Sequence, residues 1–269
     1  MTSDDSANWV TFEHRGPVTI IRLNRPEKLN AYHRSMDQMI VRYVQTLNQG
    51  EYDTRCLILT GEGRAFCSGA DVGGLAERST LNEERKPPWR PTHSEISAPR
   101  ALRDCDVPVI GALNGYAVGL GFGLALATDL RIASDDARFQ VAQLKRGLFG
   151  DYGLGHFLPQ QLGIQRGLEL MLTARMIEAQ EALDLGLVLE VVPKDELLDA
   201  ALELAGEIAK GPPLGIAASK RVAYMNDNED LHRVMDWTGL AIGHLFNSED
   251  NAEGIRSFME RREPQFQGR

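Results

Sequence analysis

Two glycine-rich stretches of this chain could hold a negatively charged oxygen with backbone amides. They span residues 65–71 (AFCSGAD) and 114–123 (NGYAVGLGFG). Each follows an apolar, β-branched run, at 56–60 and 107–113, that predicts a buried strand. Each also opens into a helical pattern, so free N–H groups should point outward there. Two such groups around one oxygen stabilise a developing negative charge, and the two stretches therefore predict the halves of one oxyanion hole.

Cysteine chemistry is a second candidate, because Cys67 lies inside the first stretch. The chain has three cysteines, Cys56, Cys67 and Cys105, an odd number without a paired metal-binding spacing. This usage is typical of a reduced compartment, and it predicts neither a disulfide framework nor a metal site. A nucleophilic thiolate needs a nearby base or cation, which the local sequence lacks. We expect Cys67 to be a small buried residue.

Alternating strands and helices are predicted to position these motifs. Two short apolar runs, 9–14 and 18–22, are separated by an Arg-Gly-Pro turn and predict a β-hairpin. Apolar residues recur at helical spacing over 36–47, which predicts an amphipathic helix before the strand at 56–60. The polar, proline-bearing segment 77–92 either shapes a pocket or is an ordinary surface loop.

The second half of the chain is predicted to be mainly helical. Its apolar patterns predict one strand and then three helices, at 187–192, 197–208, 213–226 and 231–246. No composition break marks a linker, so we place only a soft boundary near residue 200. Residues 1–200 would form the core, and residues 201–269 a helical region for packing and oligomerisation.

The composition excludes several classes of protein. With 43% hydrophobic and 25% charged residues among 269, it is that of an ordinary globular protein. A net charge of -9 argues against nucleic-acid or anionic-membrane partners. The first eight residues lack the pattern of a signal peptide, so we expect a cytoplasmic location. The uncharged segment 107–128 is long enough to cross a membrane, but its proline, its glycines and its change of pattern favour a buried strand, turn and helix.

The order of these elements, with three stretches of sequence, resembles the enoyl-CoA hydratase/isomerase superfamily, the crotonases. The stretches are AFCSGAD, NGYAVGLGFGLALATDLRIAS and LTARMIEAQEALDLGLVLEVV, and the likeness covers nearly the whole chain. It implies an α/β fold in which strand-strand-helix repeats form a spiral, followed by a C-terminal helical region. It also implies assembly as a homotrimer, or as a hexamer made of two trimers.

The resemblance also implies an acyl-CoA thioester as the substrate, with no cofactor beyond the coenzyme A that this substrate carries. By motif position, the thioester carbonyl oxygen would be held by the N–H groups of Ala70 and Leu120. Most relatives have glycine where Leu120 stands. A backbone N–H group does not depend on its side chain, so the oxyanion hole can survive while leucine narrows the pocket.

Further residues occupy positions that resemble the family's ligand-lining positions. They are Lys28, Asn30, Ala31, Ala65, Gly69, Asp71, Phe258 and Arg261. Lys28 could meet a phosphate of coenzyme A, and Phe258 with Arg261 would reach the nucleotide bound by a neighbouring subunit. An ordinary solvated or packed side chain is an open alternative for each of these. Asp71 could instead cap a helix or pair with a basic residue.

The sequence departs from the family where hydratases carry two glutamates. The first of these positions is Gly123 here, and the second is Gln143. Addition of water across a double bond needs one group to deprotonate the water and usually another to deliver a proton. Neither glycine nor an amide exchanges protons near neutral pH. Two-glutamate hydration is therefore not expected.

A carboxylate does occur nearby, at Asp151 in the stretch GLFGDYG. Family members with other chemistry, such as dienoyl-CoA isomerases, a chlorobenzoyl-CoA dehalogenase and a diketone hydrolase, carry a working aspartate at this position. The competing interpretation is a turn or helix-capping aspartate. The adjacent Tyr152 is either a hydrogen-bond donor to the substrate or a core aromatic residue.

Together these residues predict an enzyme that stabilises a thioester enolate and uses Asp151 as acid and base. One carboxylate suffices for isomerisation, with Gln143 orienting the acyl group or a water molecule. One alternative is a hydrolytic, dehalogenase-like or carbon–carbon bond-cleaving enzyme, in which Asp151 is the nucleophile or activates water. Another is an acyl-CoA-binding protein without catalytic activity.

Overall fold

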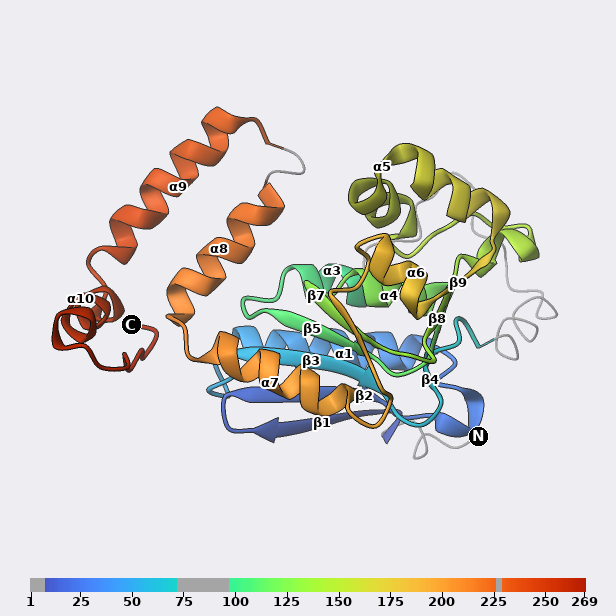
Figure 1. Ribbon diagram of the computed structural model, residues 1–269, viewed down its shortest axis with the longest axis horizontal. Helices are drawn as coiled ribbons and strands as arrows, with labels where there is room; N and C mark the ends of the chain where they lie inside the picture. Colours follow the sequence, from blue (N-terminus) through green and yellow to red (C-terminus); the bar gives the residue numbers. More distant parts are fainter. Residues whose placement is uncertain (1–7, 72–96, 226–228) are drawn as a thin grey trace, which may run out of the picture.

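The larger of two β-sheets is the frame of the molecule. The computed structural model describes residues 8–71, 97–225 and 229–269, so the predicted loop at 77–92 lies outside the described residues. In the large sheet the first two strands along the chain are antiparallel and the other neighbours are parallel (Figure 1). The strand order is β1 (Val10–Arg15), β2 (Val18–Leu23), β3 (Cys56–Gly61), β5 (Val109–Leu113), β7 (Leu130–Ser134) and β10 (Glu190–Val192).

A second, smaller sheet is built from short strands. Its order is β4 (Ala65–Cys67), β6 (Tyr116–Val118), β8 (Arg138–Gln140) and β9 (Met176–Glu178). The pairs β4–β6 and β6–β8 are parallel, and β8–β9 is antiparallel. Strands β4, β6 and β8 each come directly after a strand of the large sheet. From β3 to β8 the chain therefore visits the large sheet and then the small sheet three times in succession.

Helices complete these repeats. Those that follow or cover the strands are α1 (Arg34–Asn48), α3 (Ala98–Arg103), α4 (Leu120–Leu126), α5 (Leu154–Thr173), α6 (Ala179–Asp184) and α7 (Leu197–Ala209). The units β1-β2-α1, β3-β4-α3, β5-β6-α4 and β7-β8-α5 follow one another along the chain. The predicted spiral of strand-strand-helix repeats is confirmed.

The large sheet is buried on both faces. In β3, Leu57 and Leu59 belong to the core that includes α1, whereas Cys56 and Ile58 pack in the core that includes α7. All four are fully buried, as expected because successive side chains of a strand point to opposite faces. Helices thus cover both faces of the mostly parallel sheet, which explains why its strands read as continuous apolar runs.

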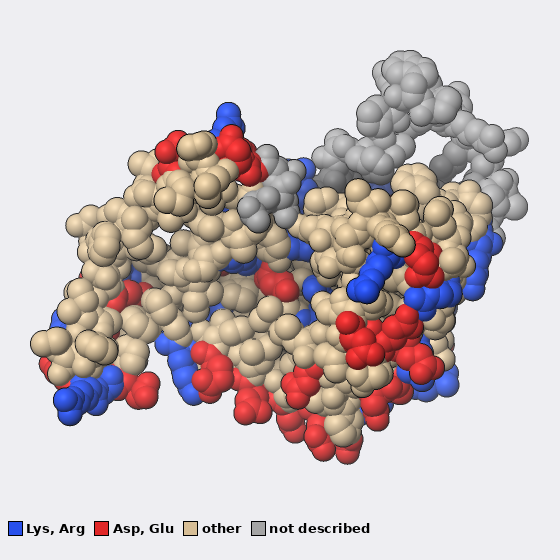
Figure 2. All heavy atoms as spheres, turned by 45° about the horizontal axis from the view of Figure 1, so that its top comes forward, with Lys and Arg blue, Asp and Glu red and all other residues tan. Residues whose placement is uncertain are grey.

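The last three helices extend away from the sheets, toward the left in Figure 1. They are α8 (Pro213–Met225), α9 (Leu231–Leu245) and α10 (Glu249–Glu260). A hollow of about 710 Å³ separates the end of α3 from α8 and α9. Figure 2 shows the depression between these helices and the core, and acidic side chains gathered along the lower edge of the core. The predicted boundary at residue 200 falls within α7.

Helix α8 is tied to the core by a buried ion pair. The Lys220 ammonium lies 2.8 Å from an Asp129 carboxylate oxygen, and both side chains are almost completely buried. Tyr224, also on α8, donates a hydrogen bond to the other oxygen of Asp129 at 2.6 Å. These contacts fix the start of the C-terminal region against the loop that precedes β7.

Several boundaries differ from the predictions. The short strands β4 and β6 come before the glycine turns, and β9 was not predicted. The strand expected at 187–192 begins only at Glu190. These strands have three residues each, too few for an alternating pattern to be visible in the sequence. The uncharged segment 107–128 contains β5, β6 and α4. None of the described helices is long and apolar enough to cross a membrane.

Candidate active site

The amide of Ala70 lies just beyond the end of β4. Residue 70 pairs with Tyr32, whose N–H donates to the Gly69 carbonyl at 2.7 Å and whose carbonyl accepts from the Asp71 N–H at 3.0 Å. Alternate amides of an extended strand point to opposite sides, so the Ala70 N–H is directed away from Tyr32. Within the described residues it donates no hydrogen bond. It is therefore available to an outside acceptor.

The amide of Leu120 lies at the start of α4. Gly119 precedes it with a φ of 56°, a backbone conformation that glycine adopts readily. Since Leu120 is the first residue of the helix, its N–H has no partner within α4, and no other described residue accepts from it. The side chain of Leu120 packs against the core.

The two glycine-rich stretches interlock. Strands β4 and β6 are parallel neighbours, so the turns that follow them lie at the same edge of the small sheet. A Cβ atom on Gly121 would lie only 2.2 Å from the Cys67 carbonyl oxygen, and one on Gly69 would lie 2.9 Å from the Val118 carbonyl oxygen. Only residues without side chains permit this approach. The predicted pair of amides is thus brought together by close backbone packing.

Cys67 has no role as a nucleophile in this arrangement. Its side chain is fully buried, and burial raises the pKa of its thiol to about 12. A thiolate is the reactive form of cysteine, so Cys67 is inert near neutral pH. The prediction of a small buried residue is confirmed.

There is no room for a side chain at position 123, which is glycine in this sequence. A Cβ atom there would lie 2.3 Å from the carbonyl oxygen of Tyr152. The loop before α5 is therefore seated on α4 at the position where hydratases of the resembled family carry their first glutamate. Tyr152 has a φ of 55° and Gly153 a φ of 90°, so the loop turns sharply here.

Gln143 holds Asp151. Gln143 lies in the short helix η3 (Ala142–Arg146) and is 7% exposed. Its Nε2 donates a hydrogen bond to Asp151 Oδ1 at 2.9 Å. Its Oε1 is buried and has no hydrogen-bond partner among the described residues. A Cβ atom on Gly119 would lie 3.6 Å from this Oε1, which places the amide of Gln143 beside the start of α4.

Asp151 lies in the turn before α5, but its side chain does not cap that helix. Helix α5 is preceded by Gly153, and no side chain caps its first turn. The Asp151 carboxylate is exposed and is oriented by Gln143, so it is not a capping group. A carboxylate that is held but accessible is able to exchange protons with a bound molecule.

Asp71 is engaged by basic side chains. Arg25 is buried, lies 2.9 Å from the Asp71 carboxylate and stacks over the ring of Trp9 at 4.1 Å. The Lys28 ammonium is 3.7 Å from the same carboxylate and its side chain is 46% exposed. Pairing of Asp71 with a basic residue is thus observed. Lys28 retains an accessible ammonium group in the segment predicted to pass along coenzyme A.

Two predicted ligand contacts are not supported by the geometry. Asn30 and Ala65 are fully buried, so neither presents a surface to a ligand. The Asn30 side chain accepts from the Arg25 N–H and donates to the carbonyls of Glu62 and Ala65. The buried Asn30 side chain therefore stabilises the backbone around it through these hydrogen bonds. Neighbouring Ala31 is partly exposed.

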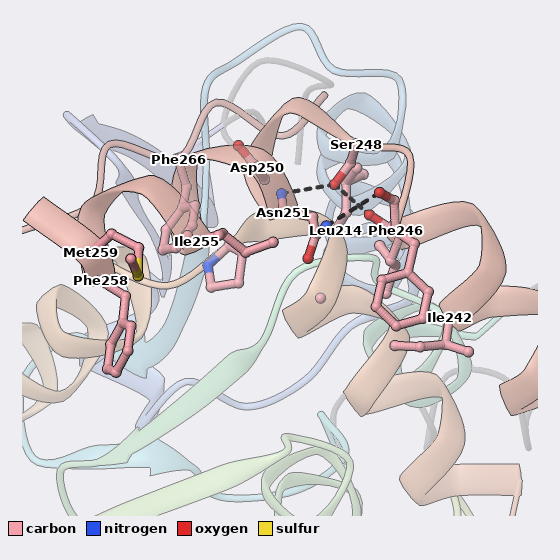
Figure 3. Close-up of a pocket in the computed structure, with 14 residues that line it drawn as sticks. Leu214, Ile242, Phe246, Ser248, Asp250, Asn251, Ile255, Phe258, Met259 and Phe266 are labelled. Atoms are coloured by element: carbon pink, nitrogen blue, oxygen red, sulfur yellow. Dashed lines mark hydrogen bonds between the residues drawn. The ribbon is translucent and has the colours of Figure 1, made fainter.

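Phe258 and Arg261 lie apart from this site. They are at the end of α10, which Figure 1 places at the opposite end of the molecule from β4. Phe258 is 81% exposed and lines an apolar pocket of about 550 Å³ (Figure 3). The structure of one chain therefore does not bring these two residues to Ala70 and Leu120. Their predicted contact with a neighbouring subunit's ligand stays a prediction.

Sequence reasoning missed a partly buried cluster that includes Tyr152. The tyrosine–aspartate cluster consists of Tyr32, Asp37 and Tyr152. The Tyr152 hydroxyl donates to Asp37 Oδ1 and lies 3.0 Å from the Tyr32 hydroxyl, which itself donates to Asp37 Oδ1 at 3.2 Å. Tyr152 is 115 positions from Asp37 and 120 from Tyr32, so no local spacing could reveal the cluster. Among the described residues, no group of His, Cys, Asp or Glu could hold a metal ion.

Comparison with known proteins gives full-length similarity. The family model described as enoyl-CoA hydratase/isomerase matches residues 13–269. The chain is 34% identical to a probable enoyl-CoA hydratase of Rhodobacter capsulatus, over 98% of this chain and 100% of that protein. It is also 34% identical to the 1,2-epoxyphenylacetyl-CoA isomerase of Escherichia coli, over 94% of this chain and 95% of that protein.

Solved structures of enoyl-CoA hydratases are also similar to this chain. The enoyl-CoA hydratase of Bacillus anthracis has a TM-score of 0.86 and 31% identity, covering 97% of this chain and 100% of that chain. The names of these relatives include a hydratase and an isomerase. They do not by themselves select one reaction for the site built around Asp151.

Proposed function

This chain belongs to the enoyl-CoA hydratase/isomerase family, and we propose that its reaction is a proton transfer along the acyl chain of an acyl-CoA thioester, with Asp151 as acid and base. The observation that carries this proposal is the hydrogen bond from Gln143 to Asp151. It orients the carboxylate, and the same Gln143 side chain lies beside Gly119, the residue before Leu120. Lys28, partly exposed, is proposed to meet a phosphate of coenzyme A.

The proposed steps need only one carboxylate. The thioester carbonyl oxygen accepts hydrogen bonds from the N–H groups of Ala70 and Leu120. Asp151 removes a proton from the carbon next to the carbonyl, and the C–H electron pair moves toward the carbonyl oxygen to form an enolate. The two amides stabilise this negative charge. The same carboxyl group returns the proton at the γ carbon, and the double bond moves from the β,γ to the α,β position.

Hydration by two glutamates is disfavoured by the same geometry. Gly123 cannot carry a side chain without displacing Tyr152, and Gln143 uses its amide to hold Asp151. The buried Gln143 Oε1 is free to accept a hydrogen bond from the acyl group or from a water molecule. This supports a role for Gln143 in orientation.

One observation favours a second candidate function. The Asp151 side chain is exposed, so water can reach it. Asp151 could then activate water or attack the substrate, which gives hydrolysis, substitution or carbon–carbon bond cleavage. The two candidates differ in whether an exchangeable α proton is removed.

Isotope exchange separates them. We expect the protein to exchange the α protons of butyryl-CoA, a saturated probe, in deuterated water, because enolate formation requires only the oxyanion hole and a base. Mass spectrometry of the recovered thioester measures the deuterium gained. Release of free coenzyme A without deuterium uptake would indicate hydrolysis instead. Tight binding of butyryl-CoA with neither change would indicate a binding protein.

We also propose self-association through the C-terminal helices, as a trimer or a dimer of trimers. Large apolar side chains are exposed on α9, on α10 and between them: Leu231, Met235, Leu240, Ile242, Phe246, Ile255, Phe258 and Met259. Figure 3 shows Ile242 and Phe246 at one side of the apolar pocket and Phe258 and Met259 at the other. Monomeric proteins rarely expose such large apolar patches.

Sedimentation equilibrium at micromolar concentration should therefore give a mass of three or six chains. Replacement of Phe258 and Met259 by serine should shift the mass toward the monomer, because both side chains are more than three-quarters exposed and carry no core packing of their own chain. A wild-type protein that sediments as a monomer would refute the assembly.

A further inference from the structure

The tyrosine–aspartate cluster joins three distant segments next to the proposed base. Asp37 lies in α1, and its Oδ1 accepts from the Tyr32 and Tyr152 hydroxyls and from the N–H of Ala98 at 3.0 Å. Ala98 is the first residue of α3. The cluster therefore ties the loop that carries Asp151 to two helices on one side of the large sheet.

The tyrosine hydroxyls are held in their protonated form. Burial raises the pKa of Tyr32 and of Tyr152 well above the usual range of tyrosine, and the nearby Asp37 carboxylate raises both further. Both groups thus remain donors at any pH at which the protein would work. Hydrogen bonds to a charged carboxylate are about twice as strong as those between neutral groups. The rings of Tyr32 and Tyr152 add an edge-to-face contact, with centroids 5.7 Å apart.

Tyr152 is held at both ends. Its hydroxyl is fixed by Asp37, and its carbonyl oxygen rests on Gly123 of α4. Its φ of 55° lies in the left-handed region, which is uncommon for a bulky residue and persists only where surrounding contacts impose it. Packing of the Tyr152 ring by itself does not require a left-handed backbone conformation. The two anchors therefore determine the path of the backbone at residues 151–153.

We propose that the tyrosine–aspartate cluster is the positioning device for Asp151. Tyr152 fixes the backbone one residue after the base, and Gln143 fixes the carboxylate itself through Asp151 Oδ1. Without the Tyr152 anchor, an exposed carboxylate on a short loop would depend on one hydrogen bond for its placement. The inference rests on the proposed function of Asp151 and assigns Tyr32, Asp37 and Tyr152 a role in positioning, not in direct contact with substrate.

Tyr152→Phe tests this role, because it keeps the ring and removes the hydroxyl. With butyryl-CoA in deuterated water, we expect kcat for α-proton exchange to fall by about tenfold to a hundredfold and KM to change by less than about twofold, since a small misplacement of a reacting group has effects of this size. Asp37→Ala should give the same loss. Asp37→Asn, which keeps an oxygen acceptor, should recover part of the rate.

Tyr224→Phe is the matched control. Tyr224 also donates to an aspartate, Asp129, but lies on α8 away from Asp151. We expect this variant to lower Tm while kcat stays at the wild-type value. If Tyr152→Phe likewise lowered only Tm, the positioning role would be wrong.

A double variant separates positioning from direct action. In an Asp151→Asn background, Tyr152→Phe should cause no further loss of exchange rate, because the group that it positions is already gone. An equal loss in both backgrounds would mean that Tyr152 acts on the substrate itself and would overturn the inference. Full exchange activity in Asp151→Asn alone would instead overturn the proposed function of Asp151.

Discussion

Asp151→Asn should lower the rate of α-proton exchange in butyryl-CoA by about 10²–10⁴-fold, the usual contribution of a general acid–base group. Asparagine has nearly the same shape but cannot accept and return a proton near neutral pH. The proposed oxyanion hole of Ala70 and Leu120 is untouched, so binding of the thioester should change little. The loss should therefore appear in kcat, with KM close to that of the wild type.

The stability of this variant should be nearly unchanged, because Asp151 is exposed and caps no helix. Surface substitutions of this kind alter the free energy of unfolding by less than about 0.5 kcal/mol. Asp195→Asn is a suitable control, since Asp195 is also an exposed aspartate in a turn before a helix. Both variants should melt at the wild-type temperature, and only Asp151→Asn should lose activity. A fully active Asp151→Asn enzyme would show that another group is the base.

Gly123→Glu should not produce a hydratase; it should destabilise the protein by about 4 kcal/mol or more. The new Cβ would lie 2.3 Å from the Tyr152 carbonyl oxygen, so α4 or the loop before α5 must move. Overpacking of a buried site costs about 1–3 kcal/mol, and a buried carboxylate without a partner adds to this cost. Chemical denaturation measures the free energy of unfolding, and hydration of crotonyl-CoA measures the activity.

Gly206→Ala and Gly123→Ala form a matched pair that isolates the steric effect. Gly206 lies inside α7, and a Cβ atom there would meet nothing within 4 Å. Gly206→Ala should be neutral or stabilise by up to about 1 kcal/mol, because alanine is the better helix former. Gly123→Ala should destabilise despite the same gain in helix propensity. A Gly123→Glu protein as stable as the wild type and active as a hydratase would refute this account of the site.

The sequence was a good guide wherever buried strands and amphipathic helices carry a clear period. The hairpin, the strand at 56–60 and the helix over 36–47 appear in the structure as β1, β2, β3 and α1, within two residues at each end. Their core faces repeat at two or at about 3.6 residues, a signal that depends only on neighbours in sequence. Three-residue strands such as β9 have no such period and were missed.

The candidate site was predictable only in its backbone parts. The glycine stretches indicated the two turns, because close backbone approach leaves glycine in the sequence. The family resemblance then assigned the two amides to Ala70 and Leu120. Contacts between distant side chains leave no local pattern, so the sequence could not show that Asn30 is buried or that Gln143 meets Asp151. The tyrosine–aspartate cluster was hidden for the same reason. It depends on packing between a loop and helix α1 that are more than 100 positions apart.

The pairing of β4 with β6 has a consequence for how activity arises during folding. One amide of the proposed oxyanion hole comes from the second repeat of the spiral and the other from the third, and Gly121 packs directly on Cys67 across that pairing. Contacts so far apart in sequence close a long loop, and the entropy cost of that closure must be met before they stabilise the protein. Each repeat alone supplies only one of the two amides. The proposed oxyanion hole therefore exists only where the second and third repeats are packed together in the tertiary structure.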